Sequence, residues 1–279
     1  MTIFINTVRS MFRRPLIVIF WSVLMLIYFF IDMSVSKIVN HFIQADEGSF
    51  FEGIIHLLQL VFNFVTKPGT FPLIVFYFLI FVFMASVPTG LVLSGYLNIV
   101  NGAVTAKQQS GGEFFGGIGK YFFRIWFITF RVLLFGLIFI IFALVASVPA
   151  IIITKAAVEG NSGMTAAAMF VDILTVCVLF FGSVFFRTYA FFWYPVAMDG
   201  HKRAFSTAKK LVDVNFWKLV IRFAVFDIIY ILFLTIMMNI GSLPLRFAVN
   251  WVFASLYFSF FITYIFATYR VIKASKKAY

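Results

Sequence analysis

Six long apolar stretches constrain what this chain of 279 residues can fold into. They run over residues 16–31, 71–100, 125–153, 167–198, 216–240 and 245–268. Roughly 20 apolar residues in a helix cross the hydrocarbon core of a bilayer, and each stretch reaches that length once the first extends toward Ile43. Strand-like alternation is missing, and lipid offers no partner to an unpaired backbone group. The sequence therefore predicts an all-α, polytopic helical membrane protein with six transmembrane helices.

Composition leaves no room for a second kind of domain. Hydrophobic residues make up 63% of the chain and charged residues 11%, too few to cover a soluble globule. We expect a single integral membrane domain over residues 1–279. The apolar run after Arg14 continues to Ile31 without a small-residue cleavage site, so the first span is expected to stay.

Lysine and arginine alternate between the two sets of loops and predict an orientation. Basic residues are retained on the cytoplasmic side of a membrane. The richer set comprises Arg9, Arg13, Arg14, Lys107, Lys120, Arg124, Arg187, Lys202, Arg203, Lys209, Lys210, Lys218, Arg270, Lys273, Lys276 and Lys277. The poorer set comprises Lys37, Lys67, Lys155 and Arg246. We therefore expect a multi-pass protein of the bacterial plasma membrane with both termini in the cytoplasm. The net charge of +12 is a topological signal, and no nucleic-acid partner is expected.

Two further helices are predicted to lie in the membrane interfaces. Over residues 50–65, the polar residues recur at helical spacing and predict a helix with one polar stripe that lies in the outer interface, or a shallow re-entrant helix. The stripe is formed by Glu52, His56, Gln59 and Asn63. Glu52 and His56 could share a metal, but no third ligand is near them in the sequence. We favour a solvated stripe and expect neither a metal nor another cofactor.

The second interfacial helix is predicted over residues 202–214, in a cytoplasmic loop. Its apolar residues, from Ala204 to Val212, can face the membrane. Four basic residues are then placed to contact lipid headgroups: Lys202, Arg203, Lys209 and Lys210. The alternative is ordinary positive flanking charge with no specific lipid site. The glycine-rich loop at 101–121 lacks the spacing of a phosphate-binding P-loop and predicts a turn that leads into an interfacial helix.

Four ionisable residues are predicted to lie within the membrane, where unpaired charge costs several kcal/mol. They are Arg131, Asp172, Arg222 and Asp227. Asp227 is the strongest functional candidate, either in a structural pair or on a proton or cation path. The sixth span carries Ser255, Ser259, Thr263 and Ala267 at intervals of four, which predicts a packing face.

Short sequence patterns in order along the chain resemble those of a broad bacterial group. They include Arg14-Pro15, Val148-Pro149, Tyr194-Pro195-Val196 before Asp199-Gly200, Asn215-Phe216-Trp217 and Leu243-Pro244-Leu245. The chain resembles the membrane domain attached to some glycerophosphodiester phosphodiesterases, and related six-helix proteins. The resemblance implies the fold and a link to lipids. The phosphodiesterase domain itself is missing here, so its activity is not implied.

The function expected from these features is non-enzymatic. No nucleophile, base and metal ligand combine at catalytic spacing. We expect a membrane protein that engages lipids, anionic ones in particular, or a partner membrane protein. The alternative is a small transporter or permease subunit with a polar path near Asp227.

Overall fold

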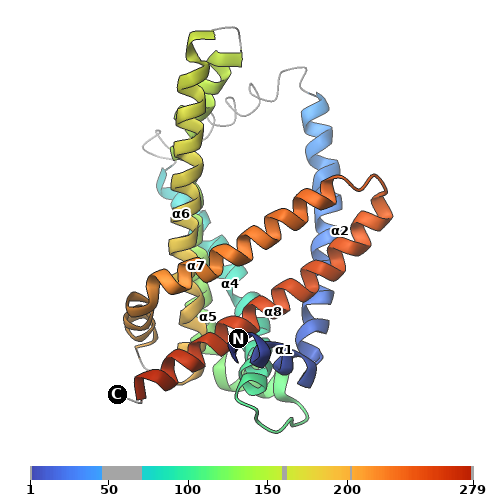
Figure 1. The fold of residues 1–279 in the computed structure, drawn as a ribbon, viewed down its shortest axis with the longest axis vertical. Helices are drawn as coiled ribbons and strands as arrows, with labels where there is room; N and C mark the ends of the chain where they lie inside the picture. The colour runs from blue at the N-terminus through green and yellow to red at the C-terminus, as the bar shows by residue number, and fades with distance from the viewer. Residues whose placement is uncertain (1, 46–70, 159–161, 202, 278–279) are drawn as a thin grey trace. The chain divides into compact units, whose positions relative to one another are not determined.

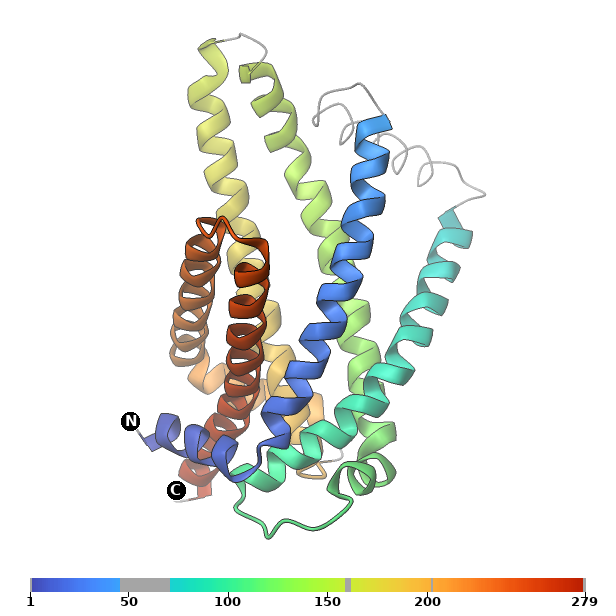
Figure 2. The ribbon, with the colours of Figure 1, turned by 90° about the vertical axis from the view of Figure 1, so that its right-hand side faces the viewer.

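The structure, a computed structural model, describes residues 2–45, 71–158, 162–201 and 203–277 (Figures 1 and 2). These residues form seven α-helices, one short 3₁₀ helix and no strand. Six of the helices are long and apolar enough to cross a membrane. The predicted all-α class and the six candidate spans are therefore confirmed.

The helices are longer than the apolar stretches that predict them. They are α1 (Thr2–Arg13), α2 (Leu16–Ala45), α4 (Phe71–Val104), α5 (Glu113–Val158), α6 (Thr165–Met198), α7 (Ala204–Met238) and α8 (Leu243–Lys277), with η1 (Ser162–Met164) before α6. At 1.5 Å per residue, a helix as long as α7 measures about 50 Å, against roughly 30 Å for the hydrocarbon core. Such helices must tilt or extend beyond the core.

Two loop segments expected to be separate are instead parts of long helices. The expected helix at 202–214 and the span at 216–240 form the single helix α7, because no glycine or proline interrupts residues 204–238. The expected interfacial helix before the third span is likewise the first part of α5, which begins at Glu113.

Helix α1 is an element that the apolar stretches do not predict. Pro15 separates it from α2, since proline lacks an N–H and restricts the residue before it. Its buried side is polar: Thr7 and Ser10 are at most 5% exposed, whereas Phe12 is 84% exposed. A helix that turns its polar side to the protein and its aromatic side outward suits a membrane interface.

The chain divides into two compact units that cut across four of the helices. Unit 1 comprises Met1–Phe30, Pro88–Thr129 and Val184–Tyr279, and unit 2 comprises Ile31–Val87 and Phe130–Ser183. Helices α2, α4, α5 and α6 each contribute to both units. In α4 the division falls at Pro88, whose missing N–H removes one helical hydrogen bond.

Helix α8 lies at the centre of unit 1. In the most apolar 18-residue stretch of α8, 50% of the residues are buried, whereas in the corresponding stretches of α5 and α6 only 6% are. The predicted packing stripe is confirmed: Ser255, Ser259, Thr263 and Ala267 are all buried. Ser259 donates a hydrogen bond to the carbonyl oxygen of Ile17 at 3.2 Å, which joins α8 to the start of α2.

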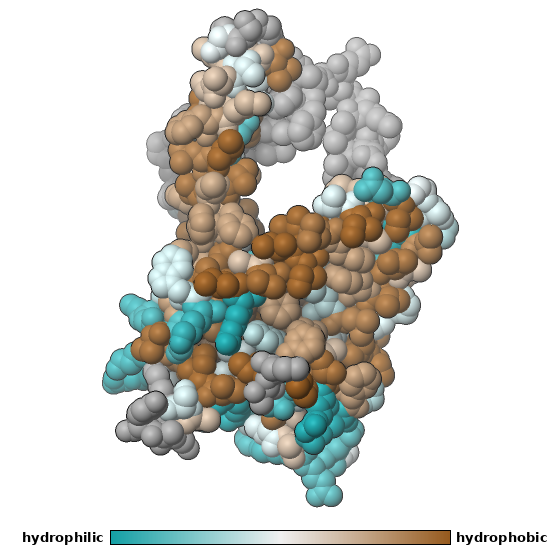
Figure 3. Space-filling view, in the orientation of Figure 1, coloured by the Kyte–Doolittle hydropathy of each residue, from teal (hydrophilic) through white to brown (hydrophobic). Residues whose placement is uncertain are grey.

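Aromatic side chains fill the space between α6, α7 and α8. Phe192, Phe223 and Phe261 are buried in one cluster with Tyr269. The rings of Phe223 and Phe261 meet edge to face with centroids 5.6 Å apart, a preferred aromatic geometry. In the space-filling view, hydrophobic residues cover the middle of α7 and α8, and hydrophilic residues gather near the chain termini (Figure 3).

Unit 2 has few buried side chains. Many described apolar residues of its helices face outward, and Phe76, Phe142 and Phe170 are each more than half exposed. One polar contact joins α5 to α6 there, where the Thr154 hydroxyl donates to both carboxylate oxygens of Asp172 at 3.0 Å. The exposed apolar surface is what a helix facing lipid presents.

Candidate functional site

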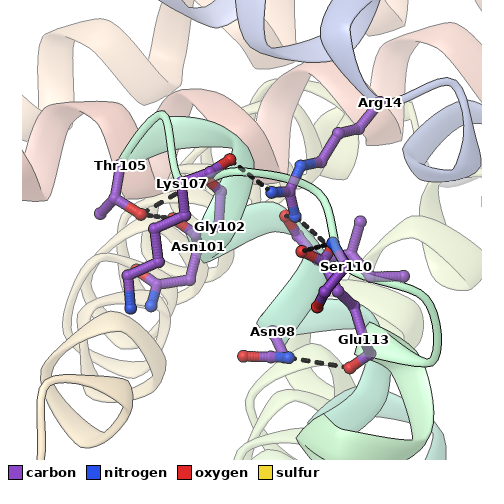
Figure 4. Close-up of polar contacts among 9 residues, drawn as sticks. Arg14, Asn98, Asn101, Gly102, Thr105, Lys107, Ser110 and Glu113 are labelled. Carbon is purple, nitrogen blue, oxygen red and sulfur yellow. Dashed lines mark hydrogen bonds and ion pairs between the residues drawn. The ribbon is translucent and has the colours of Figure 1, made fainter.

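A buried arginine organises the end of unit 1 at which both chain termini lie (Figures 2 and 4). Arg14 is 3% exposed. Its Nη1 donates to the carbonyl oxygen of Ile99 at 3.3 Å and pairs with the Glu113 carboxylate, while Nη2 donates to the carbonyl oxygen of Lys107 at 3.0 Å. These partners come from α4, the α4–α5 loop and the first turn of α5. The arginine therefore fastens that loop to the start of α2.

Gly102 and the side-chain amide of Asn98 also lie around Arg14 and Glu113 (Figure 4). A Cβ added at Gly102 would lie 2.5 Å from Arg14 Nη1, so a side chain there would displace the guanidinium. Asn98 donates to the carbonyl oxygen of Glu113 at 2.8 Å. The Glu113 carboxylate also accepts the backbone N–H of Ser110 at 3.3 Å, which ties the end of the loop to the first residue of α5.

A second cluster lies where α6 ends. Asp199 accepts hydrogen bonds from the Tyr269 hydroxyl at 2.7 Å and from Lys273 Nζ at 2.5 Å. Its other carboxylate oxygen lies 2.6 Å from Arg270 Nη2. The same Nη2 donates to Asn101 Oδ1 at 2.8 Å, which adds the end of α4 to the cluster.

The Asp199 cluster keeps its carboxyl group charged. Burial by itself would raise the pKa of Asp199, because the charged form loses hydration. The hydrogen bonds from Lys273 and Tyr269 and the charge of Arg270 outweigh burial, so the pKa lies below its ordinary value. Asp199 is therefore an anion that is already fully engaged by its neighbours.

These two clusters border a pocket of about 420 Å³ in unit 1. Its walls include Asn101, Lys107, Lys120, Tyr121, Asp199 and Arg270. Lys107 and Lys120 are exposed, and no described carboxylate lies within ion-pair distance of either amine. Arg124 is close by, since a Cβ on Gly200 would lie 3.5 Å from its Nη1. The described ion pairs leave the charges of Lys107 and Lys120 without a partner, so the pocket is positively charged.

Exposed aromatic side chains stand next to exposed cations in unit 1. Phe12, Phe123 and Trp217 are 84%, 77% and 67% exposed. Each is followed directly by an exposed basic residue, namely Arg13, Arg124 and Lys218. Aromatic rings and long basic side chains are enriched at membrane–water interfaces, where the ring meets the acyl boundary and the charge meets headgroups.

Two of the predicted headgroup contacts, Lys209 and Lys210, lie in the first turns of α7, and Arg203 directly precedes this helix. Arg203, Lys209 and Lys210 are exposed, whereas Lys202 lies outside the described residues. The apolar side of this segment does not face the membrane as expected. It packs into the core of unit 1, where Ala208, Leu211 and Val212 are at most 4% exposed. The reason is that α7 docks against α6 and α8, which removes this face from lipid.

Asp227, the strongest sequence candidate, is paired with Arg187. The Arg187 Nη1 atom donates to Asp227 Oδ1 at 2.5 Å, and Nη2 pairs with Oδ2. The guanidinium also lies 5.7 Å and 5.8 Å from the ring centroids of Phe223 and Phe261. Arg187 is predicted to belong to the basic loops. It lies within α6 instead and joins this helix to α7.

The remaining predicted polar residues are scattered. Arg131 and Arg222 are half-buried, and Asp172 accepts the bond from Thr154 in unit 2. No described carboxylate pairs with Arg222. The outer stripe, Glu52, His56, Gln59 and Asn63, lies outside the described residues. Across the ranges that are described, no three His, Cys, Asp or Glu side chains come together as a metal site.

Sequence reasoning missed most residues of the pocket. It placed Lys107, Lys120 and Arg270 in basic loops but gave no role to Asn101 or Asp199. Local signals existed, since Asp199-Gly200 reads as a turn after α6 and Ser110 to Glu113 has capping-box spacing. Neither signal indicates that these loops meet each other.

Fold and site together define an all-α polytopic membrane protein with a basic pocket in unit 1. Comparison of the chain with models of protein families, with curated proteins and with solved structures finds no match.

Proposed function

We propose that this chain is a non-enzymatic protein of the bacterial plasma membrane whose cytoplasmic side engages anionic lipid headgroups. The single observation that carries the proposal is the set of exposed cations in unit 1 that have no described carboxylate partner. Arg203, directly before α7, and Lys209 and Lys210 on α7 belong to this set, and so do Arg13, Arg124 and Lys218 beside their aromatic neighbours. Near an anionic surface, each basic residue contributes about 1 kcal/mol of attraction.

The positive-inside rule supports the choice of the cytoplasmic side, because this set belongs to the richer group of basic loops. The resemblance to membrane domains of glycerophosphodiester phosphodiesterases points to lipids as well. We favour lipid contact over the transporter alternative because the carboxylate on which transport would depend, Asp227, is engaged by Arg187.

Lipid retention by the purified protein tests the proposal. The full-length chain is extracted from nanodiscs that contain equal amounts of phosphatidylcholine and phosphatidylglycerol, and its retained lipids are counted by native mass spectrometry. We expect phosphatidylglycerol to be enriched. The triple variant Arg203→Gln/Lys209→Gln/Lys210→Gln should lower that enrichment at least about tenfold, since three surface attractions are lost.

A matched triple variant controls for total charge. Lys37→Gln/Lys67→Gln/Lys155→Gln removes the same charge from residues assigned to the opposite side. It should leave the enrichment unchanged. Equal losses in the two triple variants, or no enrichment in the unaltered chain, would contradict the proposal.

A further inference from the structure

We propose that the pocket bordered by Asn101, Lys107, Lys120 and Arg270 binds a phosphate monoester. This inference goes beyond lipid attraction at the surface of α7, because it concerns a different set of residues and a specific ligand chemistry. It rests on the proposed function only in expecting a lipid as one source of the ligand.

Charge is the first argument for an anionic ligand. Of the described residues that line the pocket, Asp199 is the one carboxylate, and it is engaged by Tyr269, Arg270 and Lys273. Lys107 and Lys120 face the same space without a described counter-ion. Two ammonium groups that no described carboxylate neutralises match a ligand with two negative charges. A phosphate monoester carries about 1.5 to 2 negative charges near pH 7, and a phosphodiester carries one.

Rigid placement of the wall is the second argument. Arg270 is held by Asp199 and by the Asn101 side-chain oxygen, at 2.8 Å. Lys107 lies in the α4–α5 loop, and Arg14 donates a hydrogen bond to its carbonyl oxygen, so the Lys107 backbone is fixed while its amine stays available. Binding groups that are already ordered lose less conformational freedom when a ligand arrives.

The donors of the wall suit phosphate oxygens. Lys120 Nζ lies 5.2 Å from the centroid of the Tyr121 ring, which keeps the amine next to the pocket. Asn101 accepts through its side-chain oxygen, so its side-chain N–H groups are the ones it can offer a ligand. Hydrogen bonds between charged donors and phosphate are among the strongest that proteins make.

The volume of the pocket and the aromatic residue near it indicate which kind of molecule carries the phosphate. A pocket of about 420 Å³ falls in the range of small-molecule sites and holds more than a bare phosphate ion. Exposed Phe123, beside Arg124, indicates that lipid is close. The ligand is therefore a phosphomonoester headgroup of a lipid or a soluble phosphate ester, and both present the same group to Lys107 and Lys120.

Binding to the full-length chain in neutral phosphatidylcholine nanodiscs tests this inference. The probes are dihexanoyl phosphatidic acid, dihexanoyl phosphatidylglycerol, glycerol 3-phosphate and inorganic phosphate, each titrated by calorimetry. We expect phosphatidic acid or glycerol 3-phosphate to bind at least tenfold more tightly than phosphatidylglycerol. Binding should strengthen as pH rises from about 5.5 to 7.5, because the second phosphate ionisation has a pKa of about 6. Tighter binding of phosphatidic acid identifies a lipid source, and tighter binding of glycerol 3-phosphate a soluble one.

Variants locate the binding. Lys107→Gln/Lys120→Gln should weaken monoester binding at least tenfold, while Lys107→Arg/Lys120→Arg, which keeps the charge and the fold, should retain it. Lys37→Gln/Lys67→Gln removes the same charge from residues assigned to the opposite side of the membrane and should leave monoester binding unchanged. Failure of all probes to bind, an absent monoester preference, or equal losses in the two glutamine pairs would overturn the inference. None of these outcomes decides whether phosphatidylglycerol is enriched by the surface of α7, so the two proposals can fail separately.

Discussion

The missing side chain of Gly102 leaves the space that the guanidinium of the buried Arg14 occupies, and it gives a sharp test of the Arg14 network. Gly102→Ala would put a methyl group where the guanidinium now lies, 2.5 Å from Nη1. We expect the variant to lose about 1–3 kcal/mol of unfolding free energy, because the displaced guanidinium leaves buried partners unsatisfied. Thermal unfolding in a non-ionic detergent measures the loss.

Gly116 provides the matched control. It lies in α5, and an added Cβ there would have no neighbour within 4 Å. Gly116→Ala should therefore be neutral or stabilising by about 0.5–1 kcal/mol, as alanine is in a helix. A similar destabilisation of both variants would show that the space at Gly102 is not what matters.

The Arg187–Asp227 pair makes a second prediction at the residue scale. Asp227→Asn leaves a mostly buried arginine without its counter-ion and should cost about 3 kcal/mol of stability. The double variant Arg187→Met/Asp227→Leu removes both charges and should recover most of that loss, since apolar replacements of a buried pair are often neutral. Thermal unfolding of the two variants distinguishes the outcomes. A double variant less stable than Asp227→Asn would contradict a purely structural pair.

Sequence reasoning at this scale identifies which groups need partners but not the partners themselves. The cost of charge in lipid singles out Asp227, yet Arg187 is 40 positions away. The bonds that Arg14 makes reach 85 to 99 positions along the chain. Such pairings depend on how the helices pack, which local spacing does not encode.

At the element scale, Asp199 fastens the end of α6 to the last turns of α8, and this link should depend on pH. The pKa of Asp199 is lower in the folded protein than its ordinary value of 3.8. The stabilisation is therefore fully present above about pH 4 and is lost as pH falls through the folded pKa. The melting temperature should drop between about pH 5 and pH 2 more steeply in the unaltered chain than in Asp199→Asn.

Comparison with the variant isolates this carboxyl group from others that titrate in the same range. The unaltered chain should be the more stable one near pH 7, and the two melting temperatures should converge at the lowest pH. Parallel curves would contradict the role of Asp199 as the link between α6 and α8.

Helix existence could be predicted from the sequence, but helix ends could not. A bilayer forces long apolar segments into helices, and all six were found. Nothing comparable marks where a helix stops, so α7 continues through the expected break near Asn215, whose side chain bonds back to the Leu211 carbonyl oxygen. Helix α1 escaped detection because its short sequence is not apolar enough to span, and its buried residues, Thr7 and Ser10, are polar.

At the scale of the whole molecule, the charge distribution predicts which ends face the cytoplasm. In a Cys177→Ser background, single cysteines replace Ser110, Ser275 or Gly163. A membrane-impermeant maleimide should label Ser110→Cys and Ser275→Cys only after cells are permeabilised, and Gly163→Cys in intact cells. The positive-inside rule is the physical reason. The opposite labelling pattern would reverse the orientation and move the basic pocket to the outer face.

The pocket itself was beyond sequence reasoning for a reason that belongs to the whole chain. Asn101, Lys120, Asp199 and Arg270 come from four separate helices or loops. Loop charge predicts that they share a side of the membrane, but only packing around α8 brings them to one place.

The bonds of Arg14 have a consequence for the order in which the protein can be assembled. Its acceptors, at Ile99, Lys107 and Glu113, lie 85 to 99 positions further along the chain and are therefore synthesised after the first span. Until then the guanidinium has no protein partner and must stay hydrated, because an unpaired charge is costly in lipid. The buried position of Arg14 therefore requires that α4 and the start of α5 are already present.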